Sequence, residues 1–181
     1  MINKIGFHRL SYLVLDVDGT MTDSGIYYGE SGNELKRFST RDGEAIKLAR
    51  SLGIKIIVIT GRSCDATDRR MRELNIDYYK QGVLDKYSFL KAYMDESGIS
   101  SVEMGYIGDD INDIKAMSLA GFIGCPSDSC EEVKKRADYI SSIPGGHGAV
   151  RDVIEFILKQ TGEWEKAMSL VYGVERQREY I

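Results

Sequence analysis

The sequence has few cysteines, an excess of acidic over basic residues, and no long apolar run. Its three cysteines, Cys64, Cys125 and Cys130, form no Cys-x-x-Cys pair, which favours reduced thiols in a cytoplasmic protein over a disulfide framework. The formal net charge of -4 argues against a nucleic-acid or anionic-membrane surface. No apolar stretch approaches the ~20 residues that span a bilayer. The first 15 residues lack the pattern of a signal peptide, so we expect a soluble protein.

What is present is an alternation of short apolar runs and amphipathic stretches. Residues 10–15 and 54–59 are apolar runs that end at polar loops, as buried strands do, and residues 42–52 carry a helical stripe closed by Gly53. Further strands are expected near 78–80, 103–107, 122–125 and 139–140, and further helices over 64–74, 86–97, 111–119, 129–136, 149–160 and 164–172. This alternation predicts an α/β fold with a parallel sheet covered by helices on both faces.

One segment interrupts the alternation, and helices follow the last expected strand. Residues 25–38 have the pattern of a β-hairpin around a glycine-rich turn at 29–33, inserted after the first strand. A C-terminal helical tail is expected over 149–181. The 181 residues are 43% hydrophobic and show no internal repeat or low-complexity linker, so we expect one domain over residues 1–181.

Polar side chains gather where the expected strands end. They are Asp16, Asp18, Thr60, Gly61, Arg62, Asp109, Asp110 and Asp113, and Lys86 stands at the start of a helix. Because ligands of a parallel sheet bind beyond the carboxyl ends of the strands, we expect these side chains to converge. Several carboxylates with no nearby His or Cys cluster select a hard cation, so the sequence predicts a Mg²⁺ site.

The same residues have the chemistry for hydrolysis of a phosphate ester. Asp16 can attack phosphorus to form an acyl phosphate, which splits one hard displacement into two easier ones. Asp18 can protonate the leaving alcohol and then deprotonate the attacking water. Lys86 can offset charge on the phosphoryl group while Thr60 donates a hydrogen bond to it. We therefore hypothesise a magnesium-dependent phosphatase with Asp16, Asp18, Thr60 and Lys86 as its catalytic residues.

Four motifs carry a family resemblance. Asp-Val-Asp-Gly-Thr at 16–20, Thr60, Lys86 and Gly-Asp-Asp-Ile-Asn-Asp at 108–113 resemble the ordered motifs of the haloacid dehalogenase-like phosphatases. The resemblance implies Mg²⁺ bound by Asp16, Asp109 and Asp18, the last through its backbone carbonyl. It places two further residues, Asp110 and Asp113, behind these ligands.

The same motifs distinguish a phosphatase from other activities of this superfamily. A phosphotransfer pump of the superfamily would carry Thr at position 18, and a dehalogenase would lack Asp18. A phosphatase-like module that only recruits a partner such as a cytidylyltransferase would have no need to keep all four motifs. Hydrolysis of phosphate esters is therefore the favoured reading.

Longer segments are similar to the capless subgroup that includes 3-deoxy-D-manno-octulosonate 8-phosphate phosphatase. They lie at 27–38, 40–43, 59–62, 81–86 and 145–151, and the similarity covers residues 8–155. It implies a Rossmann-like homotetramer in which the hairpin and the glycine-rich tail help close a neighbour's active site. The spacing agrees, because neither the stretch between Asp18 and Thr60 nor that between Lys86 and Asp109 has room for a cap domain.

The resemblance also implies a set of contacts to a sugar-acid phosphate. These candidates are Ser39, Thr40, Arg41, Asp42, Gly43, Lys47, Gly61, Arg62, Arg70 and His147, the last toward a neighbour's substrate. Planar guanidinium groups such as those of Arg41 and Arg62 pair well with the carboxylate of a sugar acid. Lys47 stands where the octulosonate branch usually has arginine. Because nonulosonate 9-phosphate phosphatases share the hairpin and the Asp-Asp-x-Asn-Asp motif, the sugar stays open between eight and nine carbons.

Overall fold

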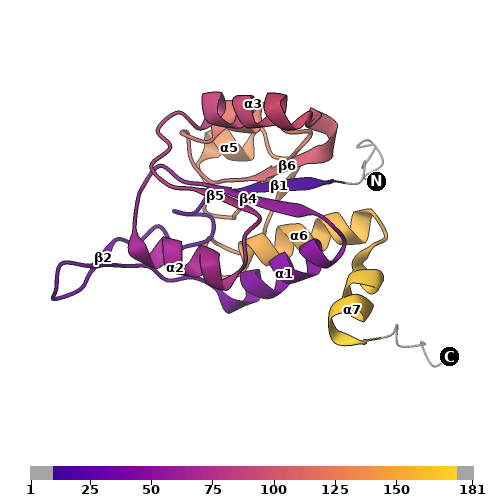
Figure 1. The fold of residues 1–181 in the computed structure, drawn as a ribbon, viewed down its shortest axis with the longest axis horizontal. Coiled ribbons are helices and arrows are strands. Elements are labelled where there is room, and N and C mark those ends of the chain that lie inside the picture. The colour runs from indigo at the N-terminus through magenta and orange to yellow at the C-terminus, as the bar shows by residue number, and fades with distance from the viewer. Residues whose placement is uncertain (1–9, 175–181) are drawn as a thin grey trace.

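The computed structural model describes residues 10–174, which form a layered α/β architecture (Figure 1). Parallel strands make one six-stranded sheet in the order β5-β4-β1-β6-β7-β8. They are β1 (Tyr12–Leu15), β4 (Lys55–Ile59), β5 (Tyr78–Lys80), β6 (Met104–Ile107), β7 (Phe122–Cys125) and β8 (Tyr139–Ile140). The predicted fold class is confirmed. Strand β1 lies between β4 and β6, where the strand order reverses, and in such sheets this crevice receives ligands.

Both faces of the sheet are buried, which explains why its strands are apolar runs rather than alternating patterns. Leu13 and Leu15 belong to one hydrophobic cluster, and Val14 between them belongs to the other. The first face is covered by α1 (Thr40–Ser51), α2 (Asp65–Glu73), α6 (Ala149–Gln160) and α7 (Trp164–Tyr172). The second is covered by α3 (Lys86–Ser97), α4 (Ile114–Met117) and α5 (Glu131–Lys134).

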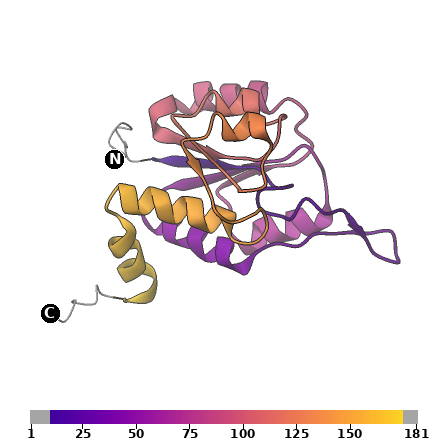
Figure 2. The same cartoon turned by 180° about the vertical axis from the view of Figure 1, so that it is seen from behind.

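The C-terminal helices belong to the core rather than to a loose tail. Helix α6 runs beside α1 and buries an apolar stripe that includes Val150, Val153 and Ile157 (Figure 2). Helix α7 follows and packs Ala167 into the same cluster. Residues 175–181 of the expected tail lie outside the described residues. No helix in the described part of the chain combines the length and apolarity needed to cross a membrane.

Two short helices differ from their expected lengths. The sequence predicted a helix over 111–119, but α4 covers only Ile114–Met117. The reason is a turn at its start, where the Asp113 carboxylate accepts hydrogen bonds from the backbone N–H groups of Asp109 and Asp110. A helix was likewise expected over 129–136, and α5 covers Glu131–Lys134. Both differences lie at helix ends, and neither changes which face the helix covers.

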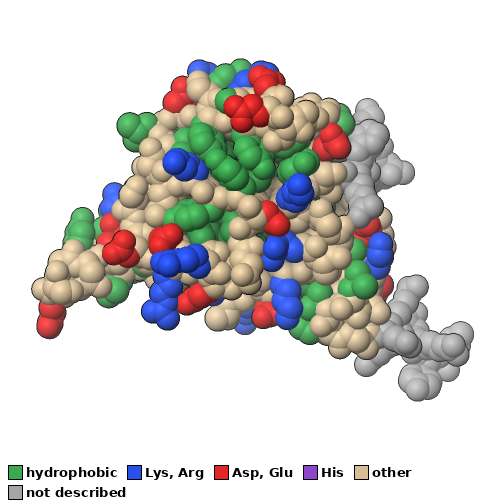
Figure 3. All heavy atoms as spheres, in the orientation of Figure 1, with side chains coloured by type: hydrophobic (Ala, Val, Ile, Leu, Met, Phe, Trp, Pro, Cys, Tyr) green, Lys and Arg blue, Asp and Glu red, His purple; other side chains and the backbone are tan. Residues whose placement is uncertain are grey.

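The hairpin stands apart from the sheet. Its strands β2 (Tyr27–Tyr28) and β3 (Glu34–Leu35) pair antiparallel, and the segment projects from the body in both ribbon views (Figures 1 and 2). Its apolar side chains are exposed, with Tyr28 at 74% and Leu35 at 50% of their full accessibility. Figure 3 shows hydrophobic atoms on this projection. The described residues between Asp18 and Thr60 hold the hairpin and α1, and no cap domain.

Candidate active site

The floor of the site is a buried lysine between two carboxylates. Asp16 follows β1, Lys86 opens α3, and Asp113 ends the loop after β6. Lys86 Nζ donates to Asp16 Oδ1 at 2.5 Å and to Asp113 Oδ1 at 2.7 Å. All three residues are at most 3% exposed. Such a pair of short, buried contacts fixes the ammonium and orients both carboxyl groups.

Asp113 is saturated by donors of its own chain. Its Oδ1 also accepts the Tyr106 hydroxyl at 2.8 Å, and its Oδ2 faces the N–H groups of Asp109 and Asp110 at 3.2 and 3.5 Å. These contacts hold the loop after β6 in place. Asp113 therefore acts as a support for the loop, as the family resemblance implied, while Asp110 contributes backbone and keeps an exposed side chain.

Asp109 is brought beside Asp16 by a tight turn after β1. Thr20 Oγ1 donates to Asp109 Oδ1 at 3.0 Å. Gly19 has a φ of +95°, and a Cβ there would lie 2.0 Å from Asp109 Oδ2. Only glycine can occupy this position, because it supplies the left-handed backbone and leaves space for the carboxylate.

The acidic cluster has the composition of a site for a hard cation. One carboxylate oxygen from each of Asp16, Asp109 and Asp113 lies within 4.8 Å of the others. Asp113 is already committed to four donors, whereas Asp16 and Asp109 each accept one side-chain hydrogen bond through Oδ1. Their second oxygens are the ones that fit Mg²⁺, which prefers oxygen ligands and retains waters. Asp18 takes no part in this cluster through its side chain, in line with the backbone-carbonyl role that the resemblance implied.

Burial and mutual repulsion of the carboxylates favour positive charge in the site. Burial raises the pKa of Asp16 well above its usual range, the Asp113 carboxylate adds to this, and Lys86 opposes it. Burial and Asp113 together raise the pKa of Asp109 to about 7. Burial lowers the pKa of Lys86, but the two carboxylates outweigh it, and the net shift is upward. A divalent cation would favour the ionised carboxylates that burial alone disfavours.

Asp18 lies between two hydrogen-bond donors at the partly exposed opening of the site, which we call its mouth. Its Oδ2 accepts the Thr60 hydroxyl at 3.4 Å, and its Oδ1 accepts the ammonium of Lys36 from the hairpin. Lys36 is a site residue that the sequence analysis did not single out. Period-2 alternation places Lys36 on the same hairpin face as Glu34, but it does not show that this face meets the loop after β1.

The arginines predicted to contact the substrate form hydrogen bonds with other residues of the same chain. Arg62 Nη2 lies 2.8 Å from Glu34 Oε2. Arg70 Nη2 donates to the Ser39 carbonyl at 3.2 Å and packs on Gly43, where a Cβ would lie 2.8 Å from it. Thr40 and Arg70 line a small cavity beside Lys36. Gly61 follows Thr60 at the end of β4. These residues border the mouth on the side of the hairpin.

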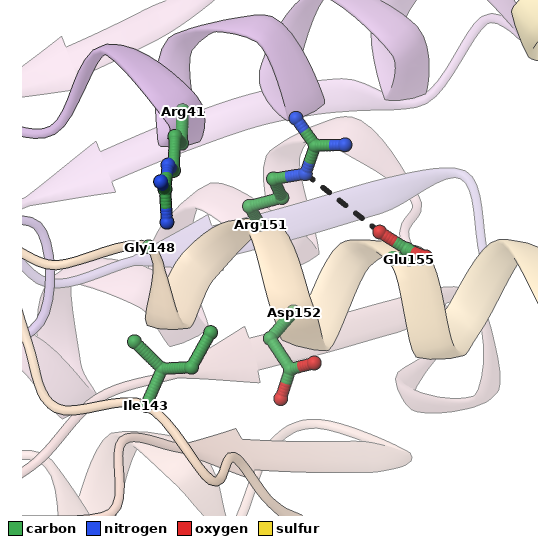
Figure 4. A pocket seen from close by; sticks show the side chains of 6 residues that line it. All are labelled: Arg41, Ile143, Gly148, Arg151, Asp152 and Glu155. Atoms are coloured by element: carbon green, nitrogen blue, oxygen red, sulfur yellow. Dashed lines mark ion pairs between the residues drawn. The ribbon is translucent and has the colours of Figure 1, made fainter.

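Three other candidates, all on α1, face the C-terminal helices. Asp42 is 2% exposed and accepts the Arg151 N–H at 2.9 Å, which caps the first turn of α6. Lys47 stands over the Tyr172 ring of α7, 5.2 Å from its centroid. Arg41 lines a separate cavity of about 360 Å³ with Arg151 and other residues at the start of α6 (Figure 4). The structure thus brings the motif residues together, and a substrate contact for these three residues stays a prediction.

The glycine-rich segment before α6 packs on the loop after β1 of the same chain. Gly146 N donates to Thr20 O at 3.2 Å, and a Cβ at Gly145 would lie 1.9 Å from Gly19 O. Within residues 145–148, His147 alone is exposed. Its Nε2 lies 2.9 Å from Nη1 of Arg37 in the hairpin. The segment therefore supports the site of its own chain, and His147 ties that support to the hairpin.

Comparison with known proteins agrees with this geometry. A model for haloacid dehalogenase-like hydrolases matches residues 13–83 and 79–153. The 3-deoxy-D-manno-octulosonate 8-phosphate phosphatase KdsC of Escherichia coli K12 is 36% identical over 159 residues, 88% of this chain and 85% of that protein. KdsC of Haemophilus influenzae is 32% identical over 155 residues, covering 86% of each.

A solved structure shows that the similarity extends from the sequence to the fold. The octulosonate phosphatase of Moraxella catarrhalis, in complex with a magnesium ion, a phosphate ion and KDO, superposes with a TM-score of 0.84 at 38% identity. The match covers 88% of this chain and 92% of that one. Family model, curated relatives and solved structure agree with the four motifs found at the strand ends. The chain belongs to the haloacid dehalogenase-like hydrolases and, within them, to the phosphatases similar to 3-deoxy-D-manno-octulosonate 8-phosphate phosphatase.

Proposed function

We propose that this phosphatase hydrolyses the phosphate monoester of a sugar acid, 3-deoxy-D-manno-octulosonate 8-phosphate, through an aspartyl phosphate on Asp16. One observation carries the proposal: Asp16 is buried at a strand end, held by Lys86, with a second carboxylate, Asp18, two residues on at the mouth. A nucleophile and a separate acid-base group in this order support a two-step displacement.

In the first step Asp16 attacks phosphorus and the sugar alcohol leaves. Lys86 donates to Oδ1 at 2.5 Å, which fixes the rotamer of the nucleophile. Because Lys86 is also anchored by Asp113, it keeps its position as charge develops on the phosphoryl oxygens. Asp18 supplies the proton that the leaving oxygen needs. Its position depends on the Thr60 hydroxyl, 3.4 Å from Oδ2.

In the second step water hydrolyses the acyl phosphate, and Asp18 now accepts the proton it takes from that water. Asp16, Asp109 and the Asp18 carbonyl would hold Mg²⁺. When bound, the ion supplies positive charge to the carboxylates and to a phosphate oxygen. Thr60 lies at the end of β4 and its hydroxyl can turn from Asp18 to a phosphoryl oxygen.

The substrate assignment rests on the relatives and on the rim. Relatives at 36% and 32% identity are phosphatases of octulosonate 8-phosphate. Arg62 and Arg70 carry guanidinium groups of the kind that bind a carboxylate, and in the free protein these groups contact Glu34 and the Ser39 carbonyl. Lys47 gives no support to either sugar, since it lies over Tyr172. A nine-carbon nonulosonate 9-phosphate is the competing substrate.

Phosphate release from a panel of esters tests the proposal. The panel contains octulosonate 8-phosphate, a nonulosonate 9-phosphate and p-nitrophenyl phosphate, each with Mg²⁺, with chelator, and with chelator followed by excess Mg²⁺. We expect the highest kcat/KM with octulosonate 8-phosphate, no turnover in chelator, and full recovery with Mg²⁺. Preference for the nine-carbon substrate would reassign the sugar, and full activity in chelator would refute the metal requirement.

A further inference from the structure

Lys36 has a buried side chain in a hairpin that is otherwise exposed. Its side chain is 1% accessible, whereas Leu35 before it is 50% exposed. Lysine is rarely buried without an anionic partner, because removing an ammonium from water is costly. Its partners are Asp18 Oδ1 and, at 3.7 Å, Glu34 Oε1. The hairpin thus delivers a cation into the site formed by the sheet.

The other lysine of the site is already engaged. Two of the three N–H donors of Lys86 go to Asp16 and Asp113, and the residue is 3% exposed. Lys36 by contrast donates to one oxygen of Asp18, and Glu34 Oε1 receives no hydrogen bond. Lys36 therefore keeps N–H donors for a group that replaces Asp18 as its partner.

The charges of the site favour a further cationic side chain beside Lys86 and a divalent ion. Asp16, Asp18, Asp109 and Asp113 converge at the strand ends, and a phosphate monoester brings two further negative charges near neutral pH. One lysine and one divalent ion do not balance this set. Arg62 does not fill the need, because Glu34 holds it at 2.8 Å, and Arg37 turns to the Gly146 carbonyl and His147.

We propose, on the basis of the phosphatase function proposed above, that Lys36 binds the phosphoryl group of the substrate. In the free protein its ammonium is held by Asp18. When the ester binds, the ammonium exchanges the Asp18 carboxylate for a phosphate oxygen, which carries more negative charge. The exchange frees Asp18 Oδ1 for the leaving-group oxygen. It also draws the hairpin over the substrate, which helps a capless site to exclude water.

Binding of inorganic phosphate tests this role without requiring turnover. Isothermal titration calorimetry in the presence of Mg²⁺ would compare the wild type with Lys36→Met, Lys36→Arg and, as a matched control, Lys91→Met. Lys91 is an exposed lysine of α3 paired with Asp95. We expect Lys36→Met to weaken phosphate binding by about 10- to 100-fold, as for loss of a charged hydrogen bond. Lys36→Arg should restore part of the affinity, and Lys91→Met should match the wild type.

Unchanged phosphate affinity in Lys36→Met would overturn the proposal. The thermal midpoint and the far-ultraviolet circular dichroism of each variant show whether the fold is intact. If Lys36→Met does not fold, the comparison of Lys36→Arg with Lys36→Gln decides. Weaker binding in the neutral variant supports the role, and equal binding refutes it.

Kinetics separate a failure of this inference from a failure of the proposed function. With octulosonate 8-phosphate and p-nitrophenyl phosphate, Lys36→Met should raise KM and lower kcat/KM for both esters. A wild type that binds phosphate but hydrolyses neither ester would refute the function and leave the binding role of Lys36 standing. An active wild type whose Lys36→Met variant keeps its KM and its phosphate affinity would refute the inference alone.

Discussion

The strand-end site is buried and internally paired, whereas the hairpin beside it is largely exposed. Asp16, Lys86 and Asp113 form direct contacts in a buried floor fixed by three different segments. The hairpin has two short strands, and two-stranded units are marginal on their own in water. The sheet thus preorganises the catalytic residues, while closure of the site depends on a hairpin that needs contacts beyond its own two strands.

The largest effect should come from the buried nucleophile. Asp16→Asn keeps the shape of the side chain but removes the attacking oxygen and one negative ligand for Mg²⁺. We expect turnover to fall by at least about 1000-fold, while the thermal midpoint stays at or above that of the wild type because a buried charge is removed. Phosphate-release assays and differential scanning calorimetry check this. Asp95→Asn, at an exposed position on α3, is the matched control, and more than trace turnover in Asp16→Asn would contradict the covalent mechanism.

The Asp18→Asn variant separates the acid-base role of the Asp18 side chain from metal binding by the Asp18 backbone. In Asp18→Asn the backbone carbonyl remains available to Mg²⁺, but the acid-base group is lost. We expect turnover to fall by about 100- to 10,000-fold. Calorimetric titration should give a Mg²⁺ affinity close to that of the wild type. Loss of both turnover and Mg²⁺ binding would instead assign the Asp18 side chain as a metal ligand.

The floor could be predicted from the sequence because its chemistry is local to strand ends. The residues after β1, β4 and β6 converge in any sheet of this topology, so Asp16, Thr60 and Asp109 are found from pattern alone. Parallel strands buried on both faces likewise give apolar runs that identify most elements. The turn at Asp113 that shortens α4 was missed, because it depends on one carboxylate accepting two backbone N–H groups.

The contacts around Asp18 and on α1 could not be predicted as well, because they depend on how the hairpin and the helices pack rather than on where the strands end. Lys36 reaches Asp18 only when the hairpin folds back, and no local periodicity reports this. Asp42 was expected at the substrate because it lies in a motif, yet it caps α6 from inside the core. Lys47 lies five residues further along α1, and its position over Tyr172 depends on the docking of α7.

Assembly of the protein would cover the exposed apolar side chains of the hairpin. We predict a homo-oligomer, a tetramer by family resemblance, in which Tyr28 and Leu35 are covered by neighbouring chains. The double variant Tyr28→Ser and Leu35→Ser should dissociate it, since truncating an interface anchor costs about 2 kcal/mol or more. Light scattering gives the mass, and Glu30→Gln at the exposed turn is the control.

Activity of the dissociated variant should fall less than in the Asp16 and Asp18 variants, because the floor is untouched. A fully active wild-type monomer at assay concentration would contradict the prediction. It would leave the hairpin as a lid on its own chain. Truncation of the chain before α6 is not a usable alternative, since Val150, Val153 and Ile157 belong to the core.

Asp42 lies in the core, where burial rather than the chemistry of the site sets a pH dependence of stability. Burial raises the pKa of Asp42 to about 6, although the Arg151 N–H and the guanidinium groups of Arg70 and Arg151 oppose this. The unfolded carboxyl has a pKa near ~3.9. Because the folded pKa is the higher one, the folded state holds the proton that the unfolded state has lost. Wild-type stability should therefore decline between about pH 4 and about pH 6 by up to ~3 kcal/mol from this group.

Asp42→Asn keeps an oxygen acceptor for Arg151 N–H and removes the titration. The unpaired amide hydrogens add a cost that does not change with pH, so the slope of stability against pH is the quantity to compare. Urea unfolding of both proteins from pH 4 to pH 8 should give a difference that moves in favour of the variant as pH rises, then levels off above about pH 6. Asp95→Asn, on the exposed face of α3, should run parallel to the wild type. Parallel curves for Asp42→Asn would show that the folded carboxyl ionises as it does in water, and that its burial beside α6 carries no electrostatic cost.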